Sequence, residues 1–394
     1  MFHSLVGFVA AIHAVRIFAL FSFVPLIHHF FAYNHPLLSF VLASYPLMQA
    51  LGQIPFGRLS DRFGRRPVIQ IGLFGFVVGG ILCYLSTNPW MIIIGRGLQG
   101  GCAVGAPAGA WLNDCSESNA SLQAQYYMIG LGIVLAMAAS LVVAPLAEYY
   151  NLVRELFLLP TFLAFLLMSY SFTIKVPKSS QDSPVIQDTQ LQLATLWHNR
   201  RINALFTANF AVHYLQAYIL AVIPDFVFIQ AFGEIPRIIY PYAFLFAILL
   251  AAVPLKRRAW MVSLTWAGLG AILCLVSLSV GVLSSAERIS FIAGVSQLVG
   301  IFYLLLLLES AIPVGLKDSI PTHQGTIVGV SNTIQYLGMT LGSLSIYWTQ
   351  LYPVLLPTFL GIMLLSLVGA LFYIRHLTYV ILPQQSSMTE VIGA

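Results

Sequence analysis

Charged residues are scarce in this 394-residue sequence, in which Asp, Glu, Lys and Arg together make up 8%. Soluble domains carry about a quarter charged residues, so this chain cannot cover a large water-facing surface. A soluble enzyme or a nucleic-acid-binding domain is therefore excluded. The net charge of +5 comes from basic residues in short segments between apolar runs. This pattern is typical of residues that determine membrane orientation and not of a surface that binds phosphate groups.

Paired cysteines and catalytic motifs are also missing. The four cysteines (Cys83, Cys102, Cys115 and Cys274) lack the spacing of a disulfide framework or a zinc site. The sequence contains no Ser/His/Asp arrangement, no His-Glu-x-x-His pair and no glycine-rich phosphate loop. We therefore expect no enzyme activity, no cofactor and no metal. Without an ATP-binding motif, an ion gradient or the substrate's own gradient must drive any transport.

Long apolar runs dominate the sequence, with 59% hydrophobic residues and a mean hydropathy of +0.88. A helix needs about 20 apolar residues to span a bilayer, and no backbone group there can remain unpaired. Twelve runs qualify as spanning helices: 5–30, 37–57, 68–87, 90–113, 125–147, 152–174, 204–231, 236–254, 260–282, 289–312, 324–348 and 353–375. The first run is too long for a signal peptide and is expected to be retained.

Basic residues between these runs predict the orientation. With both termini in the cytoplasm, the outer loops hold three basic residues, Arg154, Arg237 and Arg288. The inner loops then hold thirteen: Arg58, Arg62, Arg65, Arg66, Lys175, Lys178, Arg200, Arg201, Lys256, Arg257, Arg258, Lys317 and Arg375. This excess favours cytoplasmic termini under the positive-inside rule.

A polar stretch, residues 175–203, divides the spans six from six and is interpreted as a cytoplasmic linker. The predicted units are an N-terminal six-helix bundle at 1–174, a C-terminal six-helix bundle at 204–376 and a cytoplasmic tail at 377–394. A weak repeat supports two halves: His13-x-x-Arg16 in the first span has a counterpart in His213-x-x-Gln216 in the seventh.

The segment after the second span, residues 57–67, reads Gly-Arg-Leu-Ser-Asp-Arg-Phe-Gly-Arg-Arg-Pro. It resembles the signature loop of the major facilitator superfamily at every defining position: Gly57, Asp61, Arg62, Gly64, Arg65 and Arg66. The resemblance implies a gating motif in which Asp61 helps latch the two halves, near the start of the eleventh span at His323. A carboxylate is stabilised at a helix N-terminus, and Gly57 is expected to allow close helix approach.

Three further segments extend the resemblance to the YajR-type proton-driven efflux group. They are residues 44–57, Glu309-Ser310-Ala311-Ile312-Pro313, and residues 325–338. The family implies an all-α membrane protein with twelve transmembrane helices in two six-helix bundles and a substrate site between them. Two departures put the direction of transport in question: Ala144-Pro145 replaces a Gly-Pro pair, and residues 121–123 lack a basic residue.

Arg96-Gly97-Leu98-Gln99-Gly100 resembles the family's second motif, Arg-x-x-Gln-Gly. An arginine inside a bilayer is functional by default. The alternative is a structural arginine that binds carbonyl groups of the first and second helices.

Arg16 is expected near the bilayer centre, about 16 Å into the first span. The carboxylates are expected elsewhere: Asp114 and Glu309 near the cytoplasmic ends of their helices, and Glu148 and Asp225 near the outer ends. A positively charged pocket is therefore predicted, suited to an anionic or polyhydroxylated ligand. The predicted substrate or proton pathway comprises His13, Arg16, Tyr45, Gln49, Arg96, Gln99, His213, Gln216, Asp225, Glu309, Asn332 and Gln335, with Gln297 at similar depth. Arg16 and the histidines have structural alternatives, as ties to backbone carbonyls; histidine also suits proton relay.

Two functions remain open. The first is proton-coupled efflux of small, partly apolar molecules. The second is uptake or export of an anionic metabolite or siderophore. A membrane enzyme or receptor lacks any supporting motif. The expected partners are a small-molecule substrate, the proton as coupling ion and the lipid bilayer, with no nucleic acid. We expect a monomeric, multi-pass protein of a bacterial cell inner membrane.

Overall fold

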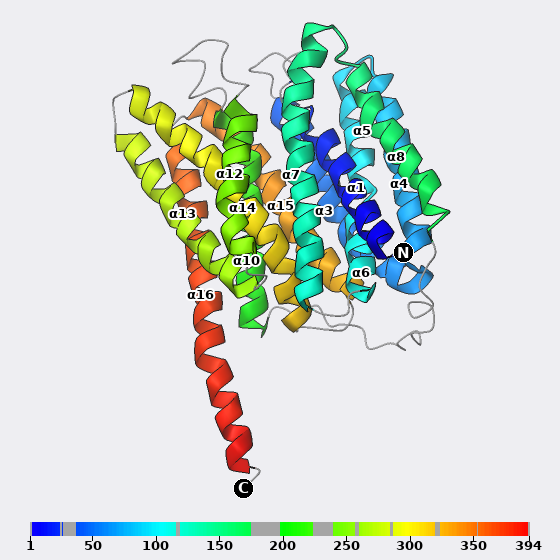
Figure 1. The fold of residues 1–394 in the computed structure, drawn as a ribbon. Helices are drawn as coiled ribbons and strands as arrows, with labels where there is room; N and C mark the ends of the chain where they lie inside the picture. The colour runs from blue at the N-terminus through cyan, green and yellow to red at the C-terminus, as the bar shows by residue number, and fades with distance from the viewer. Residues whose placement is uncertain are drawn as a thin grey trace.

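The structure is a computed structural model that describes residues 2–23, 26, 37–115, 119–174, 198–223, 239–256, 260–283, 287–319, 324–352 and 354–392. Regular structure within these ranges is helical throughout. The helices form two neighbouring groups, coloured blue to cyan-green and green to red in Figure 1. We call these groups the N-half and the C-half.

The N-half carries α1 (Phe2–Phe21), α3 (Leu37–Phe63), α4 (Arg65–Tyr84), α5 (Pro89–Gly101), α6 (Gly105–Cys115), α7 (Asn119–Tyr149), the short η2 (Glu155–Phe157) and α8 (Leu158–Ser171). The C-half carries α10 (Arg200–Ile223), α12 (Ile239–Lys256), α13 (Trp260–Leu283), α14 (Glu287–Ser319), α15 (Gln324–Leu351) and α16 (Leu355–Ile392). Each of the twelve predicted spans coincides with helix over most of its length. The halves meet chiefly where α3 packs on α15 and α7 packs on α14.

The outward surfaces of these helices are apolar. Phe74 on α4, Leu273 on α13 and Leu365 on α16 are each at least 60% exposed. Such surfaces are unstable in water and stable in lipid. Five described stretches are long and apolar enough to cross a membrane: Arg65–Tyr84, Ala124–Tyr149, Trp260–Gly281, Ile292–Ser319 and Leu355–Leu377.

The predicted span at 90–113 is not one continuous helix. It is broken at Cys102–Val104 into α5 and α6, so the expectation of an unbroken helix is wrong there. Gln53 on α3 compensates for the break, because its Oε1 accepts the Ala106 N–H at 2.9 Å. A freed backbone group can persist at membrane depth only where protein satisfies it.

Helix α14 extends beyond the predicted end of its span at residue 312. It continues through Pro313 to Ser319, and Glu309 therefore lies ten residues before the helix end rather than beside it. The expected placement of Glu309 near the cytoplasmic end is wrong. A proline within a membrane helix is tolerated where neighbouring helices satisfy the freed carbonyl.

Helices α10 and α16 extend into the predicted linker and the predicted tail. Helix α10 begins at Arg200, inside the predicted linker, whereas residues 175–197 lie outside the described part of the chain. Helix α16 continues to Ile392 and projects away from the bundle at the lower side of Figure 1, the side on which α1 begins. We call this side, where α3 passes into α4, the motif end.

Candidate functional site

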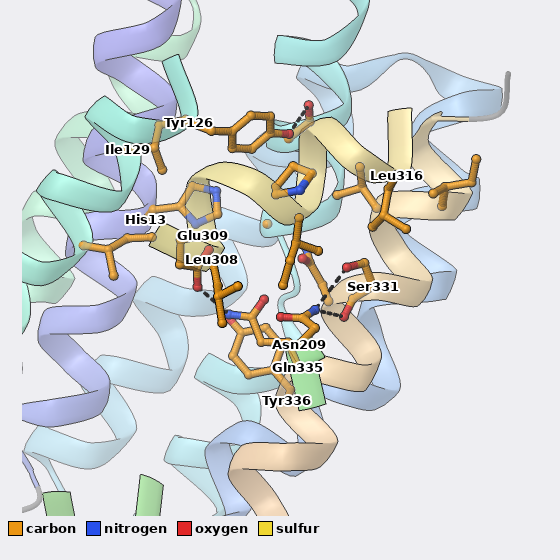
Figure 2. A pocket seen from close by; sticks show the side chains of 18 of the residues that line it. His13, Tyr126, Ile129, Asn209, Leu308, Glu309, Leu316, Ser331, Gln335 and Tyr336 are labelled. Carbon is orange, nitrogen blue, oxygen red and sulfur yellow. Dashed lines mark hydrogen bonds between the residues drawn. The ribbon is translucent and has the colours of Figure 1, made fainter. Parts of the chain in front are cut away.

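A pocket lies between the two halves, lined from both of them (Figure 2). Its apolar wall includes Ile129 and Ile133 of α7, and Leu308, Ile312 and Leu316 of α14. Its polar groups come from five helices: His13 on α1, Tyr126 on α7, Asn209 on α10, Glu309 on α14, and Ser331, Asn332, Gln335 and Tyr336 on α15. A mostly apolar cavity with a few converging polar groups is the usual form of a small-molecule site.

Glu309 is the centre of the hydrogen bonds at this pocket. Its Oε1 lies 2.8 Å from His213 Nε2 and accepts the Gln335 Nε2–H at 3.2 Å. His213 Nδ1 lies 2.8 Å from the Asn209 backbone oxygen. The Asn209 side chain donates in turn to Ser331, at 3.0 Å to the carbonyl and 3.1 Å to Oγ. The C-half thus fixes one carboxylate and one imidazole relative to each other.

The hypothesis of a pocket without a carboxylate is therefore wrong. Glu309 lines it together with His13, and both are labelled among the lining side chains in Figure 2. The physical reason is the length of α14, which carries Glu309 to the pocket level.

Arg16 is held behind the pocket rather than in its lining. Its side chain is buried, and Nη2 donates to Gln49 Oε1 and to Tyr336 Oη, both at 2.7 Å. Gln53 Nε2 donates to the same Gln49 oxygen at 2.5 Å. The guanidinium therefore links α1 to α3 and, through Tyr336, to the C-half. The structure shows no tie from Arg16 to a backbone carbonyl, which was the structural alternative, and Nε and Nη1 have no hydrogen-bond partner among the described residues.

Further hydrogen bonds join the halves beside the pocket and toward the motif end. Asn332 Nδ2 donates to Gln53 Oε1 at 3.2 Å, and Thr333 Oγ1 donates to the Ala50 carbonyl at 3.0 Å. Nearer the motif end, Lys317 Nζ donates to the Asn113 carbonyl at 3.1 Å. These contacts hold α14 and α15 against α3 and α6, so the two halves are joined beside the pocket and toward the motif end.

The gating motif forms a compact set of contacts at the motif end. Arg65 pairs with Asp61 on the preceding turn and with Asp114 of α6 at 2.9 Å, and it donates to Ser60 Oγ at 2.8 Å. Arg66 donates to the Phe172 carbonyl. Arg62 is exposed and lies over the Phe63 ring.

The structure gives a backbone reason for one of the two glycines of the gating motif and not for the other. Gly64 has φ of 91°, which strains residues with a side chain. Gly57 accepts a hydrogen bond from Ser60 Oγ, and its predicted close helix approach stays a prediction. The expected latch of Asp61 at His323 falls outside the described residues.

Arg96 adopts the structural alternative that the sequence left open. Its side chain is buried, and its guanidinium donates to the carbonyls of Ala19 at 2.6 Å and Leu20 at 3.3 Å. It also lies between the rings of Phe23 and Tyr45. These carbonyls belong to the last turn of α1, which has no further helical N–H to pair with them.

Replacing Arg96 with methionine should therefore destabilise the fold rather than alter substrate preference. Two buried carbonyls would lose their partner, at about 1–3 kcal/mol each. We expect a clear drop in melting temperature in detergent, measured by fluorescence-detected gel filtration. Arg62→Met, at an exposed arginine, is the matched control and should melt like the wild type. Equal melting of Arg96→Met and the wild type would contradict this role.

The other predicted pathway residues are dispersed. Tyr45 is buried with its hydroxyl 3.5 Å from the Arg16 carbonyl, and Gln99 is buried within the N-half. Gln216 donates to Met137 Sδ of α7 at 3.6 Å, and Gln297 donates to the Cys274 carbonyl at 2.6 Å. Asp225 lies outside the described residues. The structure thus gathers only these predicted residues into or directly against the pocket: His13, His213, Glu309, Asn332 and Gln335.

Sequence reasoning missed Gln53, Asn209 and Tyr336. Gln53 lies one helical turn after Gln49, and Asn209 lies one turn before His213, so each shares a helix face with a predicted residue. That spacing was a usable signal. Tyr336 directly follows the predicted residue Gln335. This position gave no signal, because adjacent residues in a helix face different directions.

The sequence profile of the Major Facilitator Superfamily matches residues 6–343. The chain belongs to the major facilitator superfamily. An uncharacterized transporter of Buchnera aphidicola subsp. Baizongia pistaciae is 25% identical over 349 residues, covering 84% of this chain and 86% of that protein. The inner membrane transport protein YajR of Escherichia coli K12 is 27% identical over 317 residues, covering 78% of this chain and 68% of that protein.

Solved structures agree on the fold. The proton:xylose symporter XylE, bound to 6-bromo-6-deoxy-D-glucose, superposes with a TM-score of 0.72 over 95% of both chains at 15% identity. This likeness supports the major facilitator fold, with two helical bundles, and nothing finer. Membership of the superfamily makes this chain one of a family of membrane transporters. In such folds the substrate site lies at the interface of the two repeats, the place where Glu309 and His13 line the pocket.

Proposed function

We propose that this protein is a proton-coupled secondary transporter that exports small, partly apolar molecules through the pocket between its halves. The single observation that carries the proposal is the ionisable cluster of Glu309 and His213, placed at the wall of that pocket. Ionisable groups at membrane depth are expensive and mark ion or substrate pathways. A histidine hydrogen-bonded to a carboxylate is suited to relay a proton.

The lining of the pocket supports the substrate class. Isoleucine and leucine side chains of α7 and α14 offer apolar contact area, while amide and hydroxyl groups of Asn332, Gln335 and Ser331 offer hydrogen bonds. The Glu309 carboxylate favours a ligand that donates hydrogen bonds or carries positive charge. Glu309 rather than Arg16 lines the pocket, which is less favourable to the alternative of an anionic metabolite.

The joined motif side suggests how transport proceeds. The contacts from Asn332, Thr333 and Lys317 to the N-half join the halves beside the pocket and toward the motif end in this conformation. Rocking of one half against the other would break them and open that side. The positive-inside distribution of basic residues makes the motif end cytoplasmic in this proposal, with both termini there, in a bacterial inner membrane. We propose a monomer as the functional unit.

The test is transport by the purified protein in liposomes. A panel of fluorescent amphiphilic cations and neutral compounds is presented together with an imposed pH gradient. We expect at least one compound to accumulate on the acidic side, and a protonophore to abolish the accumulation. A second panel of organic anions should show no gradient-driven movement. Accumulation confined to the anions, or unaffected by the protonophore, would overturn the proposal.

A further inference from the structure

His213 is held at both of its ring nitrogens. Nδ1 lies 2.8 Å from the Asn209 backbone oxygen, and Nε2 lies 2.8 Å from Glu309 Oε1. The imidazole is 2% exposed, so water does not replace either contact. Asn209 is itself anchored by the two hydrogen bonds that its side chain donates to Ser331. The ring orientation is therefore set by α10 and α15, independently of Glu309.

The first contact decides which nitrogen carries hydrogen. A backbone carbonyl oxygen only accepts hydrogen bonds, so Nδ1 must be the donor to Asn209. In a neutral imidazole with hydrogen on Nδ1, Nε2 presents only a lone pair. An ionised Glu309 would present another lone pair to it at 2.8 Å, which is repulsive. The observed contact therefore requires a further proton between His213 Nε2 and Glu309 Oε1.

The third contact indicates where this proton resides. Gln335 Nε2 donates to the same Glu309 oxygen that faces His213, at 3.2 Å. An oxygen that accepts two hydrogen bonds is the pattern of an ionised carboxylate, and charge-assisted bonds of this kind are the stronger ones. A protonated Oε1 would donate to His213 Nε2 and accept from Gln335 as a neutral hydroxyl, in two hydrogen bonds that are weaker than charge-assisted ones.

We propose that His213, rather than Glu309, holds the coupling proton in this conformation, as an imidazolium bonded to a Glu309 carboxylate. This inference rests on the proposed function for its meaning in transport. The proton enters the pair from the pocket at Glu309, whose side chain is 19% exposed, and is then held at His213 Nε2, so that the pair has zero net charge. When the proton leaves to water, the pair carries one negative charge and neutral His213 no longer binds Glu309.

This arrangement connects proton release to substrate binding. Without the imidazolium, Glu309 keeps only Gln335 as its described donor and becomes available to a hydrogen-bond donor or cation on a substrate. A proton on His213 and a substrate at Glu309 thus compete for one oxygen. The other titratable or charged groups around the described pocket are His13 on α1, Tyr126 on α7 and Tyr336 on α15, with Arg16 behind it. Within the described part of the chain, none of these four side chains is hydrogen-bonded to His213 or Glu309.

The test is nitrogen NMR on histidine-labelled protein in lipid bilayers at neutral pH, without substrate. The His213 signals are assigned by their loss in His213→Gln. If that variant does not fold, the contact of Nδ1 with the labelled Asn209 carbonyl carbon assigns them instead. We expect both ring nitrogens of His213 to carry hydrogen in the wild type. In Glu309→Gln, we expect Nε2 to have lost its hydrogen while Nδ1 keeps it.

A bare Nε2 in the wild type, or a doubly protonated His213 in Glu309→Gln, would overturn the inference. The spectra report on the pair whether or not transport is observed, so failure of the proposed function is recognised separately in the liposome assay. In that assay His213→Gln should lose gradient-driven accumulation. His198→Gln, at an exposed histidine, is the matched control and should accumulate substrate like the wild type; a loss as large as that of His213→Gln would overturn the inference.

Discussion

Glu309→Gln should abolish all accumulation driven by a pH gradient. Glutamine keeps the size and shape of glutamate and can still bond to Gln335 or His213, so the helix packing around the site is retained. The glutamine side chain has no negative charge to hold a proton on the His213 imidazole. Its amide neither binds nor releases a proton at the pH values of the transport assay. In proteoliposomes with an imposed gradient, we expect substrate movement to fall to the level measured without one.

Glu148→Gln is the matched control, because Glu148 is an exposed glutamate at the end of α7 rather than in the pocket. It should accumulate substrate at the wild-type rate. Elution of both variants as a single species in gel filtration shows that folding is intact. Wild-type accumulation by folded Glu309→Gln would remove the carboxylate from the coupling mechanism.

Two glycines on α15 should respond to the same substitution in different ways. A Cβ added at Gly338 would lie 2.4 Å from the Phe210 backbone oxygen, inside the C-half. A Cβ added at Gly329 would lie 2.9 Å from the Gln53 backbone oxygen, across the junction of the halves. Backbone cannot yield as a side chain does, so each valine must push helices apart. For Gly338→Val those helices are α10 and α15 of one bundle; for Gly329→Val they are α3 and α15 of different halves.

We therefore expect Gly338→Val to lose folded protein, with overpacking costing about 1–3 kcal/mol or more. Gly329→Val should fold but leave the joined conformation. Distances between nitroxide labels at Leu59 and Asp318, one in each half near the motif end, measure the separation after the native cysteines are replaced. The distance should lengthen in Gly329→Val. An unchanged distance, with folding as poor as in Gly338→Val, would show that this junction does not open.

Much of the fold was predictable because lipid leaves few alternatives. Each long apolar run must form a helix to satisfy its backbone, so composition and run length were sufficient to locate the spans. Family motifs then indicated the bundle arrangement. The break between α5 and α6 was not predictable from run length, because it depends on Gln53 of another helix to bind the freed Ala106 N–H.

The site was predicted less well, and Glu309 shows why. The predicted span ends at residue 312, which places Glu309 beside its end, but α14 continues as helix through Pro313 to Ser319. Hydropathy measures transfer into lipid, whereas this helix end is buried against other helices. The contact between Arg16 and Tyr336 was equally unpredictable, because the two residues lie 320 positions apart along the chain. Only the packing of α15 between α3 and α10 brings them together.

The distance along the chain between Arg16 and Tyr336 has a consequence for biogenesis. The first helix carries its guanidinium into the membrane when only the early part of the polypeptide exists. Gln49 emerges soon afterwards, whereas Tyr336 is synthesised among the last helices. Until then Arg16 Nη2 can bond to Gln49 but lacks its second acceptor, the Tyr336 hydroxyl. A truncated or stalled polypeptide lacking α15 would never form this contact, and its first helix would hold a less well bonded cation within the membrane.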